Sequence, residues 1–383
     1  MIDLPREIFN APKTFPAPGF EADGVTSLFY EGMPWNGRPT RVFAWYGAPT
    51  HATDEKLPAI VLVHGGGGTA FADWVRLWNS RGYAALAMDT CGGVPAWHTS
   101  PYSRNPWPRH EHSGPRGWGL DDASFFPELP AHDQWPFHAV SSVVLAASLL
   151  RSFPEIDPTR IGITGVSWGG YLTCMAAGVD ARFAFAAPVY GCGFLDGTSV
   201  GLGAQLRNDR DKPRLDQWFS LWDPSHYLPK AEMPVLWVNG TNDFAFPMDS
   251  MQKSYRIAVG ERRLAIRVRM PHGHGGAGEN PPEIHAFADA LCKGGVPLSV
   301  FGDQGHDRTS AWASFSSARK IVKAELNFTR ATGFWTDRTW YSVPAVDDAS
   351  RVSAVLPPQT TVYYFNLFDA DGIVASSEHA ALV

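Results

Sequence analysis

The sequence has little charge and no long apolar run. Charged residues make up 18% of the 383 residues, and 32 basic against 38 acidic side chains give a formal net charge of −6. A nucleic-acid-binding protein would carry a basic stripe, so this balance argues against a nucleic-acid partner. No stretch approaches the ~18 consecutive apolar residues that are typical of a membrane span, so we expect no membrane partner either.

Cysteine is also scarce, which bears on the cellular compartment. Cys91, Cys174, Cys192 and Cys292 stand far apart without a Cys-x-x-Cys pair, and a chain of this length can stabilise its core without disulfides. We therefore expect free thiols, buried in the apolar segments around Cys174 and Cys292. Residues 1–15 lack the basic and apolar regions of a secretory signal. The sequence thus predicts a cytoplasmic protein, or a secreted or periplasmic one whose signal has been removed.

Strand-like and helix-like segments alternate from about residue 24 to residue 293. Apolar runs such as residues 59–63 are typical of strands that are buried on both faces of a parallel sheet. Strands that alternate with helices indicate a mostly parallel sheet with helices on both faces. We therefore predict an α/β domain over residues 1–295, with irregular segments at about 90–135 and 192–230.

The pattern changes after Gly295. Residues 296–383 contain short runs of alternating polar and apolar residues, and the Asp371–Gly372 pair between two of these runs is a strong hairpin signal. We predict a small antiparallel β-sandwich here. A structural or oligomerisation role for it is favoured over carbohydrate binding, because its predicted strands show no distinctive aromatic platform.

The most informative segment is Gly-Val-Ser-Trp-Gly at residues 165–169. It follows a predicted strand and precedes a predicted helix, a setting in which a strained turn lifts a serine hydroxyl clear of the sheet. We predict that Ser167 is a nucleophile and that the N–H group of Trp168 stabilises a developing oxyanion at the helix N-terminus. The alternative is a glycine-rich packing turn.

A serine nucleophile needs a base, and the base needs an acid that orients it. Both partners should follow later strands, in the chain order Ser, acid, His. Asp243 follows the predicted strand 235–239, whereas Asp249 is better placed to cap the next helix. Two histidines follow the next predicted strand. We favour His274 over His272 as the base, because the loop must leave the strand before it can fold back over the nucleophile.

Four glycines, Gly65 to Gly68, follow His64 at the end of the first buried strand. Acyl transfer needs backbone N–H groups aimed at the oxyanion, and glycine lets the backbone approach it. We assign this role to Gly66, with Gly67 as a second candidate. The segment lacks the patterns of a phosphate-binding loop, so we expect no nucleotide or other cofactor. The histidine pairs of the chain do not have metal-site spacing, so we also expect no metal.

Together these motifs resemble those of the α/β-hydrolase superfamily, across about residues 24–293. The sequences HGGGG, GVSWGG, NGTNDFAFP and MPHGHG are most similar to those of its acetyl xylan esterase-like and prolyl oligopeptidase-like branches. The resemblance implies an α/β-hydrolase fold and a serine hydrolase with a triad of Ser167, Asp243 and His274. The chain departs from both branches. The best-known acetyl xylan esterases have an Arg-Gly-Gln-Gly turn in place of HGGGG, and the residues before His64 are too few for the β-propeller of a prolyl oligopeptidase.

The predicted function is a serine carboxylester hydrolase that acts through an acyl-enzyme on short acyl esters. The resemblance alone suggests acetyl groups on carbohydrate, so the expected partner is a small-molecule or carbohydrate ester. A serine peptidase acting on small peptides is one alternative, and a non-catalytic binding protein on a hydrolase scaffold is another. Trp97 and Trp118 in the long irregular segment either bind substrate, by stacking on sugar rings or lining an acyl pocket, or pack that segment onto the domain.

Overall fold

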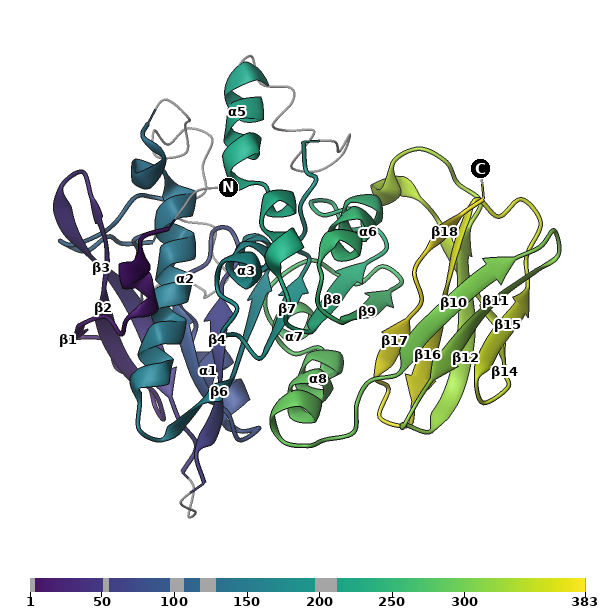
Figure 1. Ribbon diagram of the computed structural model, residues 1–383, viewed down its shortest axis with the longest axis horizontal. Helices are drawn as coiled ribbons and strands as arrows, with labels where there is room; N and C mark the ends of the chain where they lie inside the picture. Colours follow the sequence, from purple (N-terminus) through teal and green to yellow (C-terminus); the bar gives the residue numbers. More distant parts are fainter. Residues whose placement is uncertain (1–3, 51–54, 97–106, 118–128, 197–211, 383) are drawn as a thin grey trace.

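A nine-stranded sheet with helices on its faces forms most of the molecule, and two smaller antiparallel sheets lie beside it (Figure 1). The strand order in the large sheet is β1-β2-β3-β5-β4-β6-β7-β8-β9. The computed structural model describes residues 4–50, 55–96, 107–117, 129–196 and 212–382. The mostly parallel sheet, the flanking helices and the antiparallel sheets near the C-terminus agree with the predicted fold class.

The first strands of the large sheet are antiparallel: β1 (Thr14–Pro16), β2 (Thr26–Trp35) and β3 (Arg38–Gly47). The turn between β2 and β3 holds Asn36 and Gly37 at φ 50° and 71°. Asparagine and glycine tolerate this left-handed conformation, which matches the twist of a hairpin.

β5 pairs antiparallel with β3, and from β5 across the sheet to β9 the neighbouring strands are parallel. Every side chain of β5 and β7 is buried, as the continuous apolar sequence of these strands requires. Ligands of such sheets bind beyond the carboxyl ends of the strands, which all meet at one edge. The strands are β4 (Leu57–Val63), β5 (Ala84–Met88), β6 (Ile156–Val166), β7 (Phe185–Val189), β8 (Val235–Gly240) and β9 (Arg262–Arg267).

Helices cover both faces of this sheet, with α2 in front of it and α1 behind it in the view of Figure 1. α1 and α8 share a face, since the rings of Trp78 and His285 lie 4.5 Å apart. The α-helices are α1 (Ala72–Asn79), α2 (Trp135–Ser152), α3 (Trp168–Val179), α5 (Lys212–Trp222), α6 (Met248–Ile257), α7 (Gly276–Glu279) and α8 (Pro282–Cys292). Short 3-10 helices lie at Arg6–Phe9, Ala131–Asp133, Pro224–His226, Leu228–Lys230 and Trp335–Asp337.

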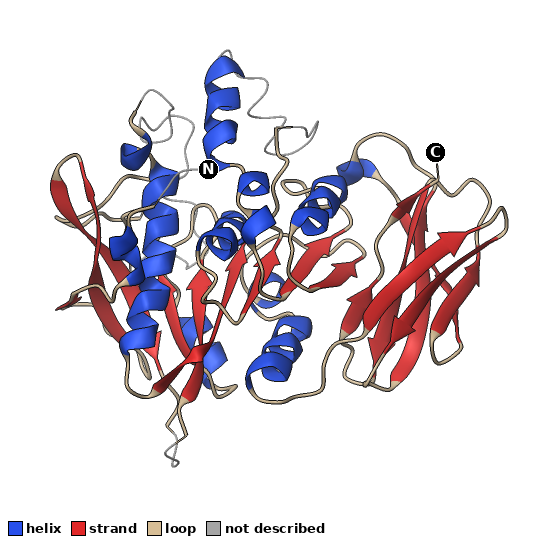
Figure 2. Ribbon diagram, viewed as in Figure 1, coloured by secondary structure: helices blue, strands red, loops and turns tan. Residues whose placement is uncertain are grey.

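The residues after α8 form two antiparallel sheets, drawn in red at the right of Figure 2. Their facing sides bury a hydrophobic core of their own, which includes Leu326, Phe365 and Leu367. One sheet contains β10 (Val300–His306), β11 (Ser310–Ser316), β15 (Arg351–Val355) and β14 (Val346–Asp347). The other contains β13 (Trp340–Pro344), β12 (Ile321–Thr329), β16 (Val362–Asp369), β17 (Val374–Ser376) and β18 (Ala380–Ala381). Two antiparallel sheets that face each other over one core agree with the predicted β-sandwich.

The C-terminal sheets pack against β9, the last strand of the large sheet. The backbone N–H of Ile266 donates to Ser376 Oγ at 2.8 Å, and Asn366 Nδ2 donates to the carbonyl of Ile266 at 3.0 Å. These bonds satisfy an edge strand that would otherwise expose unpaired backbone groups. The division of the chain at about residue 295 remains a prediction.

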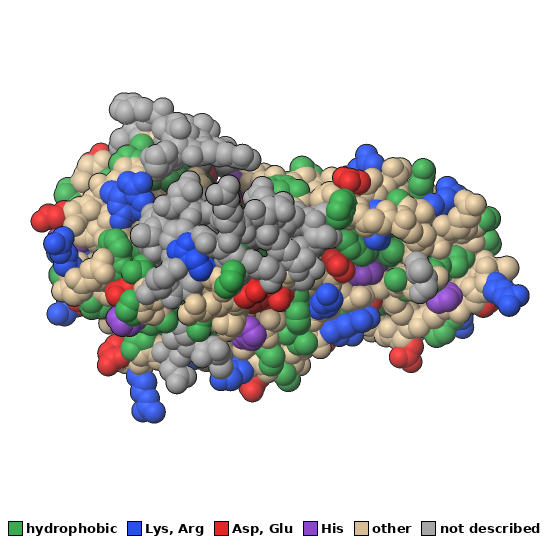
Figure 3. Space-filling model, turned by 90° about the horizontal axis from the view of Figure 1, so that it is seen from above, with side chains coloured by type: hydrophobic (Ala, Val, Ile, Leu, Met, Phe, Trp, Pro, Cys, Tyr) green, Lys and Arg blue, Asp and Glu red, His purple; other side chains and the backbone are tan. Residues whose placement is uncertain are grey.

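All four cysteines are free thiols, and Cys174 and Cys292 are buried as predicted. Burial raises the pKa of the Cys292 thiol to about 12, so it stays neutral and unreactive. No helix in the described part of the chain has the length and apolar character needed to cross a membrane. On the face seen in Figure 3, acidic and basic side chains are interspersed among hydrophobic and neutral polar ones.

Buried neutral histidines should make the protein sensitive to acid. Burial, reinforced by nearby cationic side chains, lowers the pKa of His285 and His379 to about 3 in the folded protein, against about 6.5 in an unfolded chain. Between these values the unfolded state binds more protons, so the free energy of unfolding falls as the pH drops below about 6.5. Between pH 7 and pH 5, the free energy of unfolding of His379→Phe should fall by about 2 kcal/mol less than that of the wild type. Urea unfolding at the two pH values measures both. Equal losses would contradict this role of His379.

Candidate active site

Ser167 occupies a strained turn between β6 and α3. Its backbone has φ 60° and ψ −118°, a conformation that non-glycine residues adopt only where the surrounding structure enforces it. The Ser167 N–H donates to the carbonyl of Val189 at 2.8 Å, and its carbonyl accepts from the N–H of Tyr171 at 2.9 Å. A side chain on Gly169 would lie 1.9 Å from the carbonyl oxygen of Val63. Only glycine therefore lets α3 start this close to β4, as the Gly-x-Ser-x-Gly motif predicts.

Ser167 begins a chain of two hydrogen bonds that ends at Asp243. Ser167 Oγ lies 2.9 Å from His272 Nε2, and His272 Nδ1 lies 2.6 Å from Asp243 Oδ2. The carboxylate can only accept, so Nδ1 carries the imidazole proton and Nε2 is free to accept the serine hydroxyl proton. The side chain of Asp243 is fully buried and that of His272 is 12% exposed. This geometry is that of a nucleophile, a base and the acid that orients the base.

The preference for His274 as the base is wrong: His272 contacts both Ser167 and Asp243. His274 lies two residues further along the loop and binds other groups. Its Nε2 accepts from the backbone N–H of Gly65 at 2.8 Å, and its Nδ1 lies 2.7 Å from Glu279 Oε1. The strand before the loop ends at Arg267 rather than at residue 270, so His272 is already far enough from the sheet to reach the serine.

Asp243 lies in the loop after β8, where the sequence predicts the acid. Its Oδ1 accepts from the backbone N–H groups of Ala245 at 2.9 Å and Phe246 at 2.8 Å, which leaves Oδ2 for His272. Three donors thus hold a buried carboxylate in one orientation and compensate for its burial.

Two aromatic residues that the sequence analysis did not single out flank the His272 ring. Tyr190 stacks on it with ring centroids 4.6 Å apart, and Phe244, which is 53% exposed, lies at the same distance. The Tyr190 hydroxyl donates to the carbonyl of Pro271 at 2.7 Å. Burial, and next the charge of Asp243, raise the pKa of Tyr190 well above its usual range, so it remains a donor. Tyr190 directly follows β7 at the carboxyl edge of the sheet, a position that could have identified it.

The glycine turn after β4 lies directly against the nucleophile. A side chain on Gly65 would approach Ser167 Cβ to 3.1 Å and the carbonyl oxygen of Val166 to 2.8 Å. Gly66 follows in the turn and is exposed, while Trp168 begins α3 next to the serine in the chain. The two expected oxyanion donors therefore belong to the two segments that meet at Ser167.

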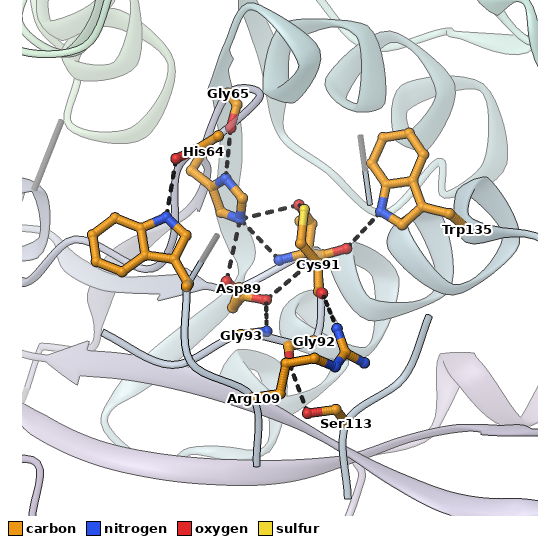
Figure 4. Close-up of polar contacts among 12 residues, drawn as sticks. His64, Gly65, Asp89, Cys91, Gly92, Gly93, Arg109, Ser113 and Trp135 are labelled. Atoms are coloured by element: carbon orange, nitrogen blue, oxygen red, sulfur yellow. Dashed lines mark hydrogen bonds and ion pairs between the residues drawn. The ribbon is translucent and has the colours of Figure 1, made fainter. Parts of the chain in front are cut away.

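A polar network supports this turn from behind (Figure 4). His64 Nε2 accepts from the backbone N–H of Thr90 at 2.9 Å, and its Nδ1 lies 2.8 Å from the carbonyl oxygen of Gly65. Burial lowers the pKa of His64, which keeps the ring neutral and able to act as both acceptor and donor. Asp89 Oδ1 accepts from the N–H of Cys91 at 2.8 Å, and Arg109 donates to the Cys91 carbonyl at 3.0 Å. The loops after β4 and β5 are thereby connected.

Aromatic rings pack beside the nucleophile. The ring of Trp168 meets Tyr171, Trp135 and Trp218 edge-on, at centroid distances of 4.9, 5.7 and 6.3 Å. Trp97 and Trp118, the expected substrate-binding residues, lie outside the described residues. Within the ranges that the structure describes, no group of three or more His, Cys, Asp or Glu side chains could hold a metal ion.

Fold and site together define an α/β-hydrolase. The chain is similar in fold to an acetyl xylan esterase from Paenibacillus sp. R4, with a TM-score of 0.58 and 20% identity over 73% of this chain and 88% of that one. It is also similar to acetyl xylan esterase 1 from Thermoanaerobacterium sp. JW/SL YS485, with a TM-score of 0.54 and 16% identity over 71% and 90%. The acylaminoacyl peptidase of Pyrococcus horikoshii gives a TM-score of 0.51 and 20% identity over 75% and 44%.

Family models match both halves of the α/β region. The acetyl xylan esterase model matches residues 20–198, and the prolyl oligopeptidase model matches residues 131–325. The chain belongs to the prolyl oligopeptidase family of serine hydrolases, and both predicted resemblances are confirmed. A curated relative, the acylamino-acid-releasing enzyme of Rattus norvegicus, is 23% identical over 262 residues, which are 63% of this chain and 32% of the relative. The chain thus spans about a third of the length of that relative.

Replacing Asp243 by Asn tests whether this carboxylate orients His272, because the variant keeps the histidine and removes only the carboxylate. The amide has one acceptor oxygen in place of two, and its NH₂ group would face the His272 Nδ1 proton or force the other tautomer. We expect a loss of about 10³–10⁴-fold in kcat with the fold retained, measured as ester turnover and by circular dichroism. A loss below tenfold would exclude Asp243 as the orienting acid, and Asp249→Asn is the matched control.

Proposed function

We propose that the protein is a serine carboxylester hydrolase that acts through an acyl-enzyme on short acyl esters, with acetyl groups on carbohydrate as the favoured substrate class. The observation that carries this proposal is the hydrogen-bonded chain from Ser167 Oγ through His272 to Asp243, at 2.9 and 2.6 Å. It supplies the base that a serine needs and the acid that the base needs.

In the first half of the reaction, His272 Nε2 takes the hydroxyl proton as Ser167 Oγ attacks the ester carbonyl. The backbone N–H groups of Gly66 and Trp168 stabilise the oxyanion of the tetrahedral intermediate. Asp243 stabilises the imidazolium that forms. The intermediate then collapses, and the C–O bond to the alcohol breaks. The alcohol leaves with the proton from His272, and the acyl group stays on Ser167.

In the second half, a water molecule replaces the alcohol. His272 Nε2 takes a proton from the water as its oxygen attacks the acyl-enzyme carbonyl, and the same N–H groups stabilise the second oxyanion. The bond from the carbonyl carbon to Ser167 Oγ breaks, and His272 returns the proton to the serine. The products are one alcohol and one carboxylic acid, and the enzyme is regenerated.

Two observations support an ester rather than a peptide substrate. Two described carboxylates lie beside the loop that carries His272 and His274, and each is hydrogen-bonded to one of these histidines. Asp243 binds His272, and Glu279 binds His274. Neither is available to bind the ammonium group of a free peptide. The match to the acetyl xylan esterase model also includes Ser167.

A serine peptidase is the second candidate, and the family membership favours it. The match to the prolyl oligopeptidase model includes Ser167, Asp243 and His272, and a relative is described as an acylamino-acid-releasing enzyme. Such an activity would use the same three residues on a blocked peptide. It would differ in the leaving group, which is an amine that His272 would have to protonate.

We expect p-nitrophenyl acetate to be hydrolysed with a kcat/KM at least 100-fold higher than that of N-acetyl-alanine p-nitroanilide. We also expect Ser167→Ala to reduce ester turnover by at least 10³-fold with the melting temperature unchanged, because it removes only the hydroxyl. Both substrates release a chromophore, so one spectrophotometric assay compares them.

Amide cleavage as fast as ester cleavage would favour the peptidase instead. A loss of less than tenfold in Ser167→Ala would show that the serine is not the nucleophile and would leave a binding protein on a hydrolase scaffold. A panel of acetylated sugars and simple acetate esters then identifies the alcohol part of the preferred ester substrate.

A further inference from the structure

We propose that His274 is a positioning residue that fixes the peptide between Gly65 and Gly66, so that the Gly66 N–H group stays aimed at the reacting carbonyl. The inference rests on the proposed function, because it assigns the residue that orients one of the two oxyanion donors. It assigns a role to His274, which is not part of the hydrogen-bonded chain from Ser167 to Asp243.

The loop after β9 carries two histidines, and each is paired with a carboxylate in the same way. In the first, Asp243 and His272 lie 2.6 Å apart and the ring faces the Ser167 hydroxyl at 2.9 Å. In the second, Glu279 and His274 lie 2.7 Å apart and the ring faces the backbone N–H of Gly65 at 2.8 Å. The side chains of His274 and Glu279 are 11% and 8% exposed, so water competes little for these bonds.

The hydrogen bonds determine the tautomer of His274. Because the Gly65 N–H donates to Nε2, that nitrogen carries no proton, and the proton on Nδ1 is donated to Glu279. The carboxylate therefore fixes an acceptor on the opposite side of the ring. Nε2 of His274 binds the backbone N–H of Gly65, whereas Nε2 of His272 faces the Ser167 hydroxyl.

The other side of Gly65 is held as well. Its carbonyl oxygen lies 2.8 Å from His64 Nδ1, as Figure 4 shows, and accepts from the N–H of Gly68 at 3.0 Å. A peptide group is planar and trans, so the Gly65 carbonyl and the Gly66 N–H lie in one plane and point in opposite directions. Holding Gly65 at both its N–H and its carbonyl therefore sets the direction of the Gly66 N–H.

Such anchoring is needed because the turn consists of four glycines. Glycine has the widest backbone freedom, so a run of four has a low intrinsic preference for any one orientation. The close contact with Ser167 demands glycine at position 65, so rigidity has to come from outside the turn. His274 is itself held by the ring of Phe71 at 4.8 Å, and Trp74 Nε1 donates to the carbonyl of Glu279 at 3.2 Å.

Two variants of His274 separate positioning from mere packing. In His274→Gln, the longer amide can place its oxygen near the position of Nε2 and accept from Gly65. In His274→Asn, the shorter amide can reach Glu279 but not Gly65. With p-nitrophenyl acetate as substrate, we expect His274→Asn to lose 10- to 100-fold in kcat with KM within about threefold, since a misaligned donor costs part of the 10²–10³-fold effect of a lost one. We expect His274→Gln to stay within about fivefold of the wild type.

A transition-state analogue supplies a readout that a structural role would not affect. A trifluoromethyl ketone forms a tetrahedral adduct with the serine, and its oxygen binds where the oxyanion does. Its affinity should fall in His274→Asn by about the same factor as kcat, while the pH profile of kcat/KM keeps the shape that it has in the wild type. Glu279→Gln and Glu279→Ala repeat the comparison without altering the ring, with Glu279→Ala the more damaging.

Equal losses in His274→Gln and His274→Asn, or a rise in KM without a fall in kcat, would overturn the proposal. So would wild-type kcat in His274→Asn and Glu279→Ala. These results differ from a failure of the proposed function, which would appear as ester turnover retained in Ser167→Ala. If Ser167→Ala and His272→Ala are inactive while His274→Asn is fully active, only the positioning role is lost.

Discussion

The strained backbone of Ser167 is the constraint on which the site depends. With φ at 60° the residue turns the chain from β6 into α3, and the turn survives because glycines admit the neighbouring backbones at distances that a side chain would block. The same close packing brings the glycine turn after β4 against the serine. Parallel strands deliver Asp243 and His272 to the same edge. Residues far apart in the chain thus converge on one hydroxyl group.

Much of this arrangement could be predicted from the sequence, because buried parallel strands and a Gly-x-Ser-x-Gly turn have clear signatures. The choice between the two histidines could not. It depended on where the last strand ends and how the chain turns after it. Arg269 adopts φ 53°, and its N–H donates to Thr241 Oγ1 at 3.0 Å, so the chain turns back earlier than the apolar pattern indicates. A left-handed arginine has no reliable sequence signal, and two residues were enough to exchange the roles of His272 and His274.

Tertiary packing also explains the parts that the sequence analysis missed. The helix at Lys212–Trp222 falls in a stretch predicted to be irregular, although Leu215, Trp218, Phe219 and Trp222 lie on one helical face and are buried. Trp218 packs against α3, where its ring contacts Trp168 and Tyr171. The apolar spacing within the segment indicates a helix, but the sequence does not show which other segment its buried face contacts. The C-terminal hairpin at Asp371–Gly372 was predictable because its signal is local.

The proposed mechanism requires that the Ser167 hydroxyl is the reactive group. Peptide mapping by mass spectrometry after reaction with a fluorophosphonate tests it directly, because this reagent forms a covalent adduct only with an activated hydroxyl. We expect one adduct per chain, on the peptide that contains Ser167, formed at a rate that falls by at least 10²-fold in His272→Ala. A stoichiometric adduct on a different residue, or no adduct with the folded protein, would contradict the central claim.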